Sequence, residues 1–173
     1  MIREINGVPC AIIGRAYPST PIANPRDMVA DWAFGIQDDN MLKIVTEARA
    51  KGAQVVVLSH NGMDVDLKIA SRVEGTVAIM GGNTHDGMPM ASIVSNKSGN
   101  TLVTNAGSNA KFLAVPDFEV KDQKVSNLRC KLLPMFANMM PADHDMDSLI
   151  TNRCPAHRGY AAYNCRFQHK NDL

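Results

Sequence analysis

The sequence predicts an α/β fold in which a sheet with parallel strands is flanked by helices. Two short runs, 55–58 and 77–80, are almost wholly apolar and rich in valine, which is typical of buried strands. The segment between them, 65–73, has the length of a helix and carries apolar residues at helical spacing: Leu67, Ile69, Ala70 and Val73. The pattern predicts a β-α-β unit, in which a right-handed crossover joins two parallel strands.

The residues before this unit predict one strand, one loop and one helix. Residues 9–14 read as a buried strand, and 16–35 as a long irregular loop that holds the only tryptophan. A helix is expected over 38–51, capped by Asp38 or Asp39 and ended by Gly52. Its apolar stripe would consist of Met41, Ile44, Val45 and Ala48.

The residues after the unit predict strands joined by short turns. Runs of strand-like composition occur at 91–94, 101–104, 112–120 and 124–133, and their spacing predicts an antiparallel meander. A helix would start at 146–150 and be interrupted by the sequence Asn-Arg-Cys-Pro that follows. The whole chain therefore reads as α/β with an antiparallel, α+β-like second part.

Composition excludes several classes of function. A chain of 173 residues suffices for one domain with a sizeable core. The net charge of +1 gives no reason to expect nucleic acid or an anionic membrane surface as a partner. The apolar runs are too short to cross a bilayer, and the first residues lack the apolar segment of a signal peptide.

Polar loops follow the two parallel strands at the point where each strand ends. His60 follows the first strand, and Asn83 and His85 follow the second. Carboxyl ends of parallel strands meet at one edge of a sheet, where ligands bind in open α/β folds. Imidazole is the commonest transition-metal ligand in proteins, and an Asn carbonyl is a weaker one. The pattern therefore suggests a metal site, although strand-end histidines and Gly-Gly-Asn turns also occur without any ligand.

These loops resemble the late metal-binding motifs of the 5′-nucleotidase type of metallophosphoesterase. The resemblance rests on residues 59–64 (SHNGMD) and 81–87 (GGNTHDG). Within that superfamily the chain is most similar to the SoxB family of thiosulfohydrolases, through flanking segments spread over about residues 5–150. These segments are 17–25 (YPSTPIANP), 31–38 (DWAFGIQD), 102–113 (LVTNAGSNAKFL) and 131–134 (KLLP).

The resemblance implies a hydrolase with two divalent metal ions, manganese or alternatively zinc. His60 and position 83 would serve one ion and His85 the other, with Asp86, Asn61 and Asn105 beside the ligands or on the substrate side. It also implies a periplasmic enzyme that acts on a cysteine S-thiosulfonate of a sulfur-carrier protein and releases sulfate in thiosulfate oxidation. Neither nucleic acid nor a membrane is expected as a partner.

The sequence departs from the family in two ways. Asn83 stands where the family usually has a histidine, and the early motifs that supply the bridging carboxylate and other ligands are not found before His60. Residues 1–150 are therefore expected to be a partial domain, the second half of a metallophosphoesterase β-sandwich flanked by helices, inactive by itself. The alternatives are part of a 5′-nucleotidase-like phosphoesterase and a non-catalytic half-domain.

The last segment, 151–173, falls outside the resemblance and is expected to be a disordered, non-homologous tail. It concentrates two cysteines and two histidines in a short stretch. A Cys2His2 zinc site is the alternative reading, with the ligands Cys154, His157, Cys165 and His169.

Overall fold

The computed structural model describes residues 1–122, 124–136 and 138–153, which form parts of two compact units. The first unit is Met1–Met135 and the second is Phe136–Leu173. In the second unit the described residues form helix α4, His144–Arg153, which begins before residue 146 and continues past Ile150. The four candidate zinc ligands and most of the predicted tail lie outside the described residues.

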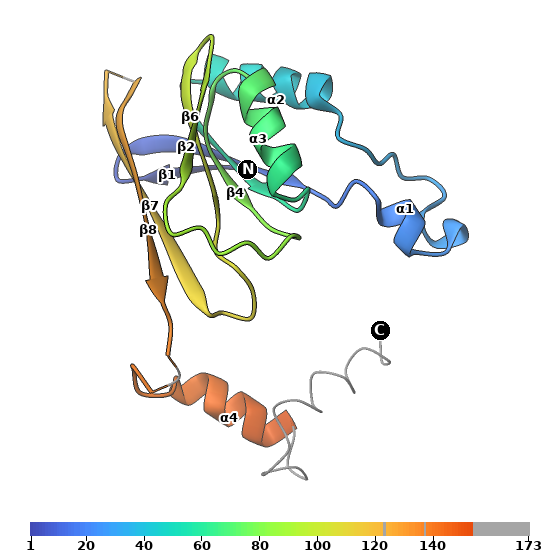
Figure 1. Ribbon diagram of the computed structural model, residues 1–173, viewed down its shortest axis with the longest axis vertical. Coiled ribbons are helices and arrows are strands. Elements are labelled where there is room, and N and C mark those ends of the chain that lie inside the picture. Colours follow the sequence, from blue (N-terminus) through green and yellow to red (C-terminus); the bar gives the residue numbers. More distant parts are fainter. Residues whose placement is uncertain (123, 137, 154–173) are drawn as a thin grey trace. The chain divides into compact units, whose positions relative to one another are not determined.

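Within the described chain, the first unit contains a six-stranded sheet of order β1-β2-β3-β4-β6-β5 (Figure 1). Strands β2, β3, β4 and β6 are parallel, while β1 and β5 are antiparallel edge strands. The predicted β-α-β unit is confirmed, and β1 was not predicted. The bounds are β1 Ile2–Ile5, β2 Val8–Arg15, β3 Gln54–Ser59, β4 Thr76–Gly81, β5 Ser92–Asn96 and β6 Gly99–Asn105.

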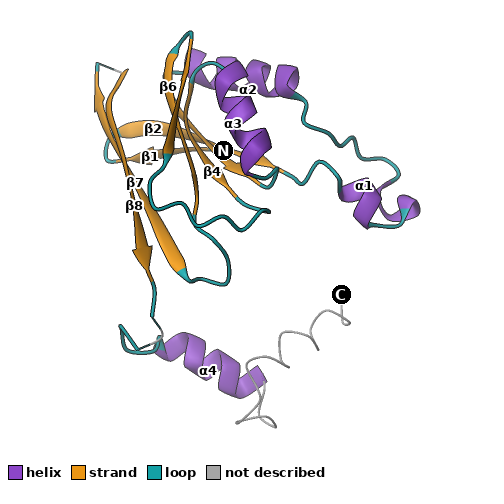
Figure 2. Cartoon of the chain, viewed as in Figure 1, coloured by secondary structure: helices purple, strands orange, loops and turns teal. Residues whose placement is uncertain are grey.

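Two helices, α2 (Asp38–Ala50) and α3 (Met63–Arg72), cover one face of this sheet (Figure 2). Alternate residues of the strands point to this face and form a closely packed apolar core with the helices. The core includes Met41, Val45, Val57, Ile69, Ile79 and Val103, each at most 2 % exposed. The predicted cap of α2 is wrong: the N-cap residue is Gln37, which has a left-handed φ of 47° and makes no side-chain cap bond.

The predicted meander is also wrong, because its strands divide between two sheets. Strand β6 pairs in parallel with β4 and holds β5 at the edge of the main sheet. Strands β7 (Phe112–Lys121) and β8 (Lys124–Pro134) form a separate antiparallel hairpin. The reason is burial: residues 101–105 of β6 are all buried and suit a central strand, whereas β7 alternates between exposed and half-buried residues.

The hairpin lies on the side of the sheet away from α2 and α3 (Figure 1). A cavity of about 610 Å³ separates it from the sheet. Its lining is mainly apolar and includes Ile12, Val56 and Met80 of the sheet with Phe118 and Val120 of the hairpin. Helices on one face and strands on the other agree with the predicted mixed α/β fold.

The loop between β2 and α2 is partly helical, contrary to the prediction of an irregular segment. It contains α1 (Thr20–Ala23), which has a proline in its first turn, and a 3-10 turn at Arg26–Val29. Trp32 is 71 % exposed. Among the described helices, none is long and apolar enough to cross a membrane.

Candidate functional site

The predicted site residues lie in the loops at the carboxyl ends of the parallel strands. His60 directly follows β3 and is exposed, and Asn83 and His85 lie in the exposed loop that begins after β4. Asn105 is the last residue of β6, the next parallel strand. The β-α-β geometry therefore brings all three loops to one edge, as expected from the topology.

The first two loops are in direct contact at Gly62 and Gly82. A Cβ atom built on Gly82 would lie 3.3 Å from the carbonyl oxygen of Ser59 and 4.0 Å from Cδ2 of His60. A Cβ atom built on Gly62, which has a φ of 97°, would lie 3.5 Å from Nδ2 of Asn83. The two glycines therefore let the His60 turn and the Asn83 turn approach each other closely.

Asn83 and His85 both have left-handed backbones, with φ values of 81° and 61°. Such conformations are uncommon for residues with a side chain and cluster at ligand-binding sites, where surrounding contacts maintain them. Of the three candidates in the second loop, the proposed ligands Asn83 and His85 have this conformation and Asp86 does not. Asn6 and Asp122 have the same conformation in other turns, so it is compatible with a binding role and does not by itself require one.

Contacts with the end of β2 also fix the His60 turn. The backbone N–H of His60 donates to the carbonyl oxygen of Arg15 over 3.0 Å, and the ring centroids of Tyr17 and His60 are 5.6 Å apart. The Arg15 guanidinium donates to the carbonyl oxygens of Gly35 and Ile36. Arg15 thus connects the His60 turn with both ends of the long β2–α2 loop.

Asp86 connects the second loop to its neighbours. Its carboxylate accepts a hydrogen bond from the Thr84 hydroxyl, which itself accepts one from the backbone N–H of Met63 over 3.3 Å. The carbonyl oxygen of Asp86 accepts a bond of 2.7 Å from the N–H of Gly107. Asp86 therefore links α3 with the loop after β6.

Asn61 and Asn105 point into the protein and not into solvent. They are 6 % and 2 % exposed, and Nδ2 of Asn61 donates to Oδ1 of Asp66 over 3.4 Å. Asp66 is itself fully buried, which raises the pKa of its carboxyl, while hydrogen bonds from Ser59 and Asn61 act in the opposite direction. Asp66 was not predicted as a site residue, although its spacing from Ile69 and Ala70 puts an acid on the apolar stripe of the helix.

The donor set on the described residues fits part of a metal shell. Two imidazoles and one amide are suitable ligands for manganese or zinc, and Asn83 lies beside the His60 turn. However, no three His, Cys, Asp or Glu side chains within the described ranges gather closely enough to hold a metal. His60, His85 and Asp86 are therefore not assembled into a metal cluster, and these residues do not complete a dinuclear centre.

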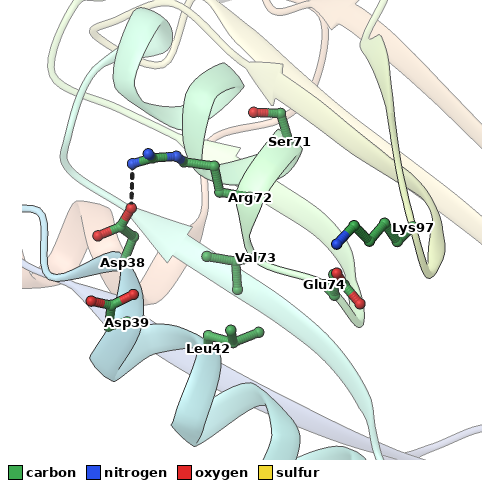
Figure 3. Close-up of a pocket in the computed structure, with 8 residues that line it drawn as sticks. All are labelled: Asp38, Asp39, Leu42, Ser71, Arg72, Val73, Glu74 and Lys97. Carbon is green, nitrogen blue, oxygen red and sulfur yellow. Dashed lines mark hydrogen bonds and ion pairs between the residues drawn. The ribbon is translucent and has the colours of Figure 1, made fainter.

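A polar pocket at a distance from these loops contains none of the candidate residues (Figure 3). It has a volume of about 490 Å³ and lies between the start of α2 and the end of α3. Asp38 and Arg72 form an exposed ion pair of 2.6 Å across it. Such a pair adds little to stability, and the mixed charges of the lining do not resemble the predicted site.

Solved structures of known hydrolases share this fold. The sulfate thiohydrolase SoxB from Thermus thermophilus matches with a TM-score of 0.81 and 28 % identity, over 91 % of this chain and 29 % of that one. A 5′-nucleotidase precursor, also from Thermus thermophilus, matches with a TM-score of 0.75 and 25 % identity, over 88 % of this chain and 32 % of that one. No family model matches the chain.

A curated relative supports the same relationship. The trifunctional nucleotide phosphoesterase YfkN of Bacillus subtilis is 24 % identical over 127 residues, which are 72 % of this chain and 8 % of that protein. The chain thus spans a third or less of the proteins that it matches. Taken together, these likenesses support a place for the chain in the superfamily of 5′-nucleotidase-type phosphoesterases, and they do not separate SoxB from the nucleotidases.

Proposed function

We propose that this chain forms the late-motif part of a metal-dependent hydrolase centre, with His60, Asn83 and His85 as its metal-binding residues. The observation that carries the proposal is the contact between two strand-end loops, one bearing His60 and the other bearing Asn83 and His85 in left-handed conformations. Manganese is the proposed metal, with zinc as the alternative. A bound divalent cation would supply Lewis-acid polarisation of the bond under attack.

The chain's own residues contribute positioning to this centre. Tyr17 lies beside the His60 ring and restricts its orientation. The hydrogen bond from the His60 backbone N–H to Arg15 fixes the position of the His60 backbone. The amide of Asn83 presents an oxygen where relatives usually have an imidazole, so it should bind its metal less tightly. The early motifs that would supply the bridging carboxylate are not found before His60.

The substrate that we propose is a cysteine S-thiosulfonate on a sulfur-carrier protein, from which hydrolysis would release sulfate. The SoxB match has the higher TM-score and identity of the two solved structures described above. Such an enzyme would act in the periplasm. A nucleotide substrate is the second candidate, because the curated relative is a nucleotide phosphoesterase.

Metal binding is tested by titrating Mn²⁺ into the chain and following NMR signals. We expect paramagnetic broadening of the His60 and His85 rings at Mn²⁺ concentrations that leave His144, an exposed histidine of α4, sharp. His60→Ala should weaken the effect at His85, whereas the matched variant His144→Ala should not. Equal broadening of all three histidines would contradict the proposed site.

Substrate class is tested by binding to the Mn²⁺-loaded chain. A short peptide with a cysteine S-thiosulfonate should shift the amide signals of the loop at 106–109, and a nucleoside monophosphate at the same concentration should not. The reverse result would favour the nucleotidase reading. A lack of any shift with either compound would favour the non-catalytic half-domain.

A further inference from the structure

A buried carboxylate lies beside the loops that carry His60 and Asn83 and is not one of the proposed metal ligands. Asp66 is in α3 and is 0 % exposed, on the same helix face as Ile69 and Ala70. Burying a carboxylate costs several kcal/mol unless hydrogen bonds satisfy it. Its partners therefore indicate what the residue does.

One carboxylate oxygen bonds the residues on both sides of His60. Oδ1 of Asp66 accepts a hydrogen bond of 2.5 Å from the Ser59 hydroxyl and one of 3.4 Å from Nδ2 of Asn61. The backbone N–H of Asn61 donates to the Ser59 hydroxyl oxygen over 3.2 Å. These three bonds join Ser59, Asn61 and Asp66 in a closed, buried ring. His60, which lies between Ser59 and Asn61 in the sequence, is exposed to solvent.

The other oxygen faces the ends of the next two strands. A Cβ atom built on Gly81 would lie 2.7 Å from Oδ2 of Asp66 and 3.8 Å from Nδ2 of Asn105. Gly81 and Asn105 are partners in the parallel register of β4 and β6. Both Oδ2 of Asp66 and Nδ2 of Asn105 are buried and lack a hydrogen-bond partner, and as acceptor and donor they are complementary.

Helix capping does not account for Asp66. Its backbone N–H already donates within the helix to the carbonyl oxygen of Gly62 over 3.0 Å, and the N-cap makes no side-chain bond. Asp64 and Asp66 are both acids of the first turn and both can interact with the helix dipole, but Asp64 is the exposed one. The Asp66 side chain instead bonds Ser59 and Asn61, which precede the helix, and its other oxygen faces the end of β4.

We propose that Asp66 is a positioning residue that holds the His60 turn against the end of β4 and thereby sets the separation of His60 and Asn83. The value of that separation for metal binding rests on the proposed function, but the positioning itself does not. Asp66 would act through Ser59 and Asn61 and would not touch metal or substrate.

The experiment compares NMR spectra of the metal-free chain with those of three variants. Asp66→Asn changes the buried acid, and Asp64→Asn is its matched control, since it removes the same charge from the same helix. Ile69→Val controls for destabilisation, because it removes one methyl group from the same buried face. The readouts are the ring signals of His60, which lie near the Tyr17 ring, and the hydrogen exchange of the Asn61 amide.

We expect Asp66→Asn to shift or broaden the His60 ring signals and to speed Asn61 exchange about tenfold, which is the scale of one lost hydrogen bond. Asp64→Asn and Ile69→Val should leave the His60 signals at their wild-type positions. If Asp66→Asn does not fold, Ser59→Ala should reproduce the effect and Ser59→Thr, which keeps the hydroxyl, should restore the wild-type signals.

Wild-type His60 signals in both Asp66→Asn and Ser59→Ala would overturn the positioning role. So would equal changes in Asp66→Asn and Asp64→Asn. The Mn²⁺ titration of the unaltered chain tests the metal site separately. Failure of that titration with altered His60 signals in Asp66→Asn would refute the proposed function and leave the positioning role standing.

Discussion

Replacing Gly81 by alanine places a methyl group in the most crowded part of the site. The new Cβ would lie 2.7 Å from Oδ2 of Asp66 and 3.4 Å from the carbonyl oxygen of Thr104. The first distance is shorter than any relaxed contact between these atoms. The carboxylate cannot easily retreat, because Ser59 and Asn61 hold its other oxygen. Gly81→Ala should therefore destabilise the chain and disturb the His60 turn.

Gly14 provides a matched control in the same sheet. It lies in β2, and a Cβ atom built there would have nothing within 4 Å. Removing a glycine stabilises a fold by about 0.4–1 kcal/mol through the unfolded chain where the site tolerates the change. Overpacking a filled site costs roughly 1–3 kcal/mol. Both variants share the gain from the unfolded chain, so we expect Gly81→Ala to be less stable than Gly14→Ala by about 2 kcal/mol, the middle of the overpacking cost.

Urea denaturation followed by circular dichroism measures this difference. Thermal unfolding should separate the two variants by about 6 °C, since 1 kcal/mol shifts Tm by roughly 2–4 °C in a chain of this size. A double-mutant cycle with Asp66→Ala isolates the clash, because the combined variant should lose less stability than the sum of the single changes. Equal stabilities of Gly81→Ala and Gly14→Ala would refute the reasoning.

Three further predictions concern acidity and metals. Burial raises the pKa of Asp66 in the folded chain. Protonation of Asp66 therefore stabilises the fold fully below the pKa of the unfolded chain, and this stability is lost as the pH rises through the folded pKa. In urea melts at rising pH, the wild type should lose stability relative to Asp66→Asn, and a constant difference would contradict this. Asn83→His should tighten Mn²⁺ binding near His60 about tenfold, as measured by paramagnetic broadening; unchanged affinity would mean that residue 83 is not a ligand. Because the described donors do not complete a dinuclear centre, the chain with added Mn²⁺ should hydrolyse neither a thiosulfonate nor a nucleotide above the metal blank, and turnover abolished by His60→Ala would overturn this expectation.

The local periodicity of the sequence determined the β-α-β unit and the place of its loops. Two apolar runs of strand length with a helix between them are joined by a right-handed connection, so the sequence predicts that His60 and Asn83 share one edge of the sheet. The structure agrees because β3 and β4 are buried along most of their length, as continuous apolar runs in central parallel strands are.

Pairing between distant segments was decided only by the tertiary structure. Strand β6 follows β5 in a hairpin, which local turn signals favour, yet its other edge pairs with β4 and removes it from the predicted meander. The same pairing places Asn105 beside Gly81 and encloses Asp66, whose place on the apolar stripe could be read from the sequence but whose partners could not. Sequence patterns report which face of an element is apolar, whereas the choice of partner depends on how much surface the complete sheet can bury. The histidines at the strand ends were therefore readable from the sequence, whereas the bonds of Asp66 beside His60 became visible only in the folded chain.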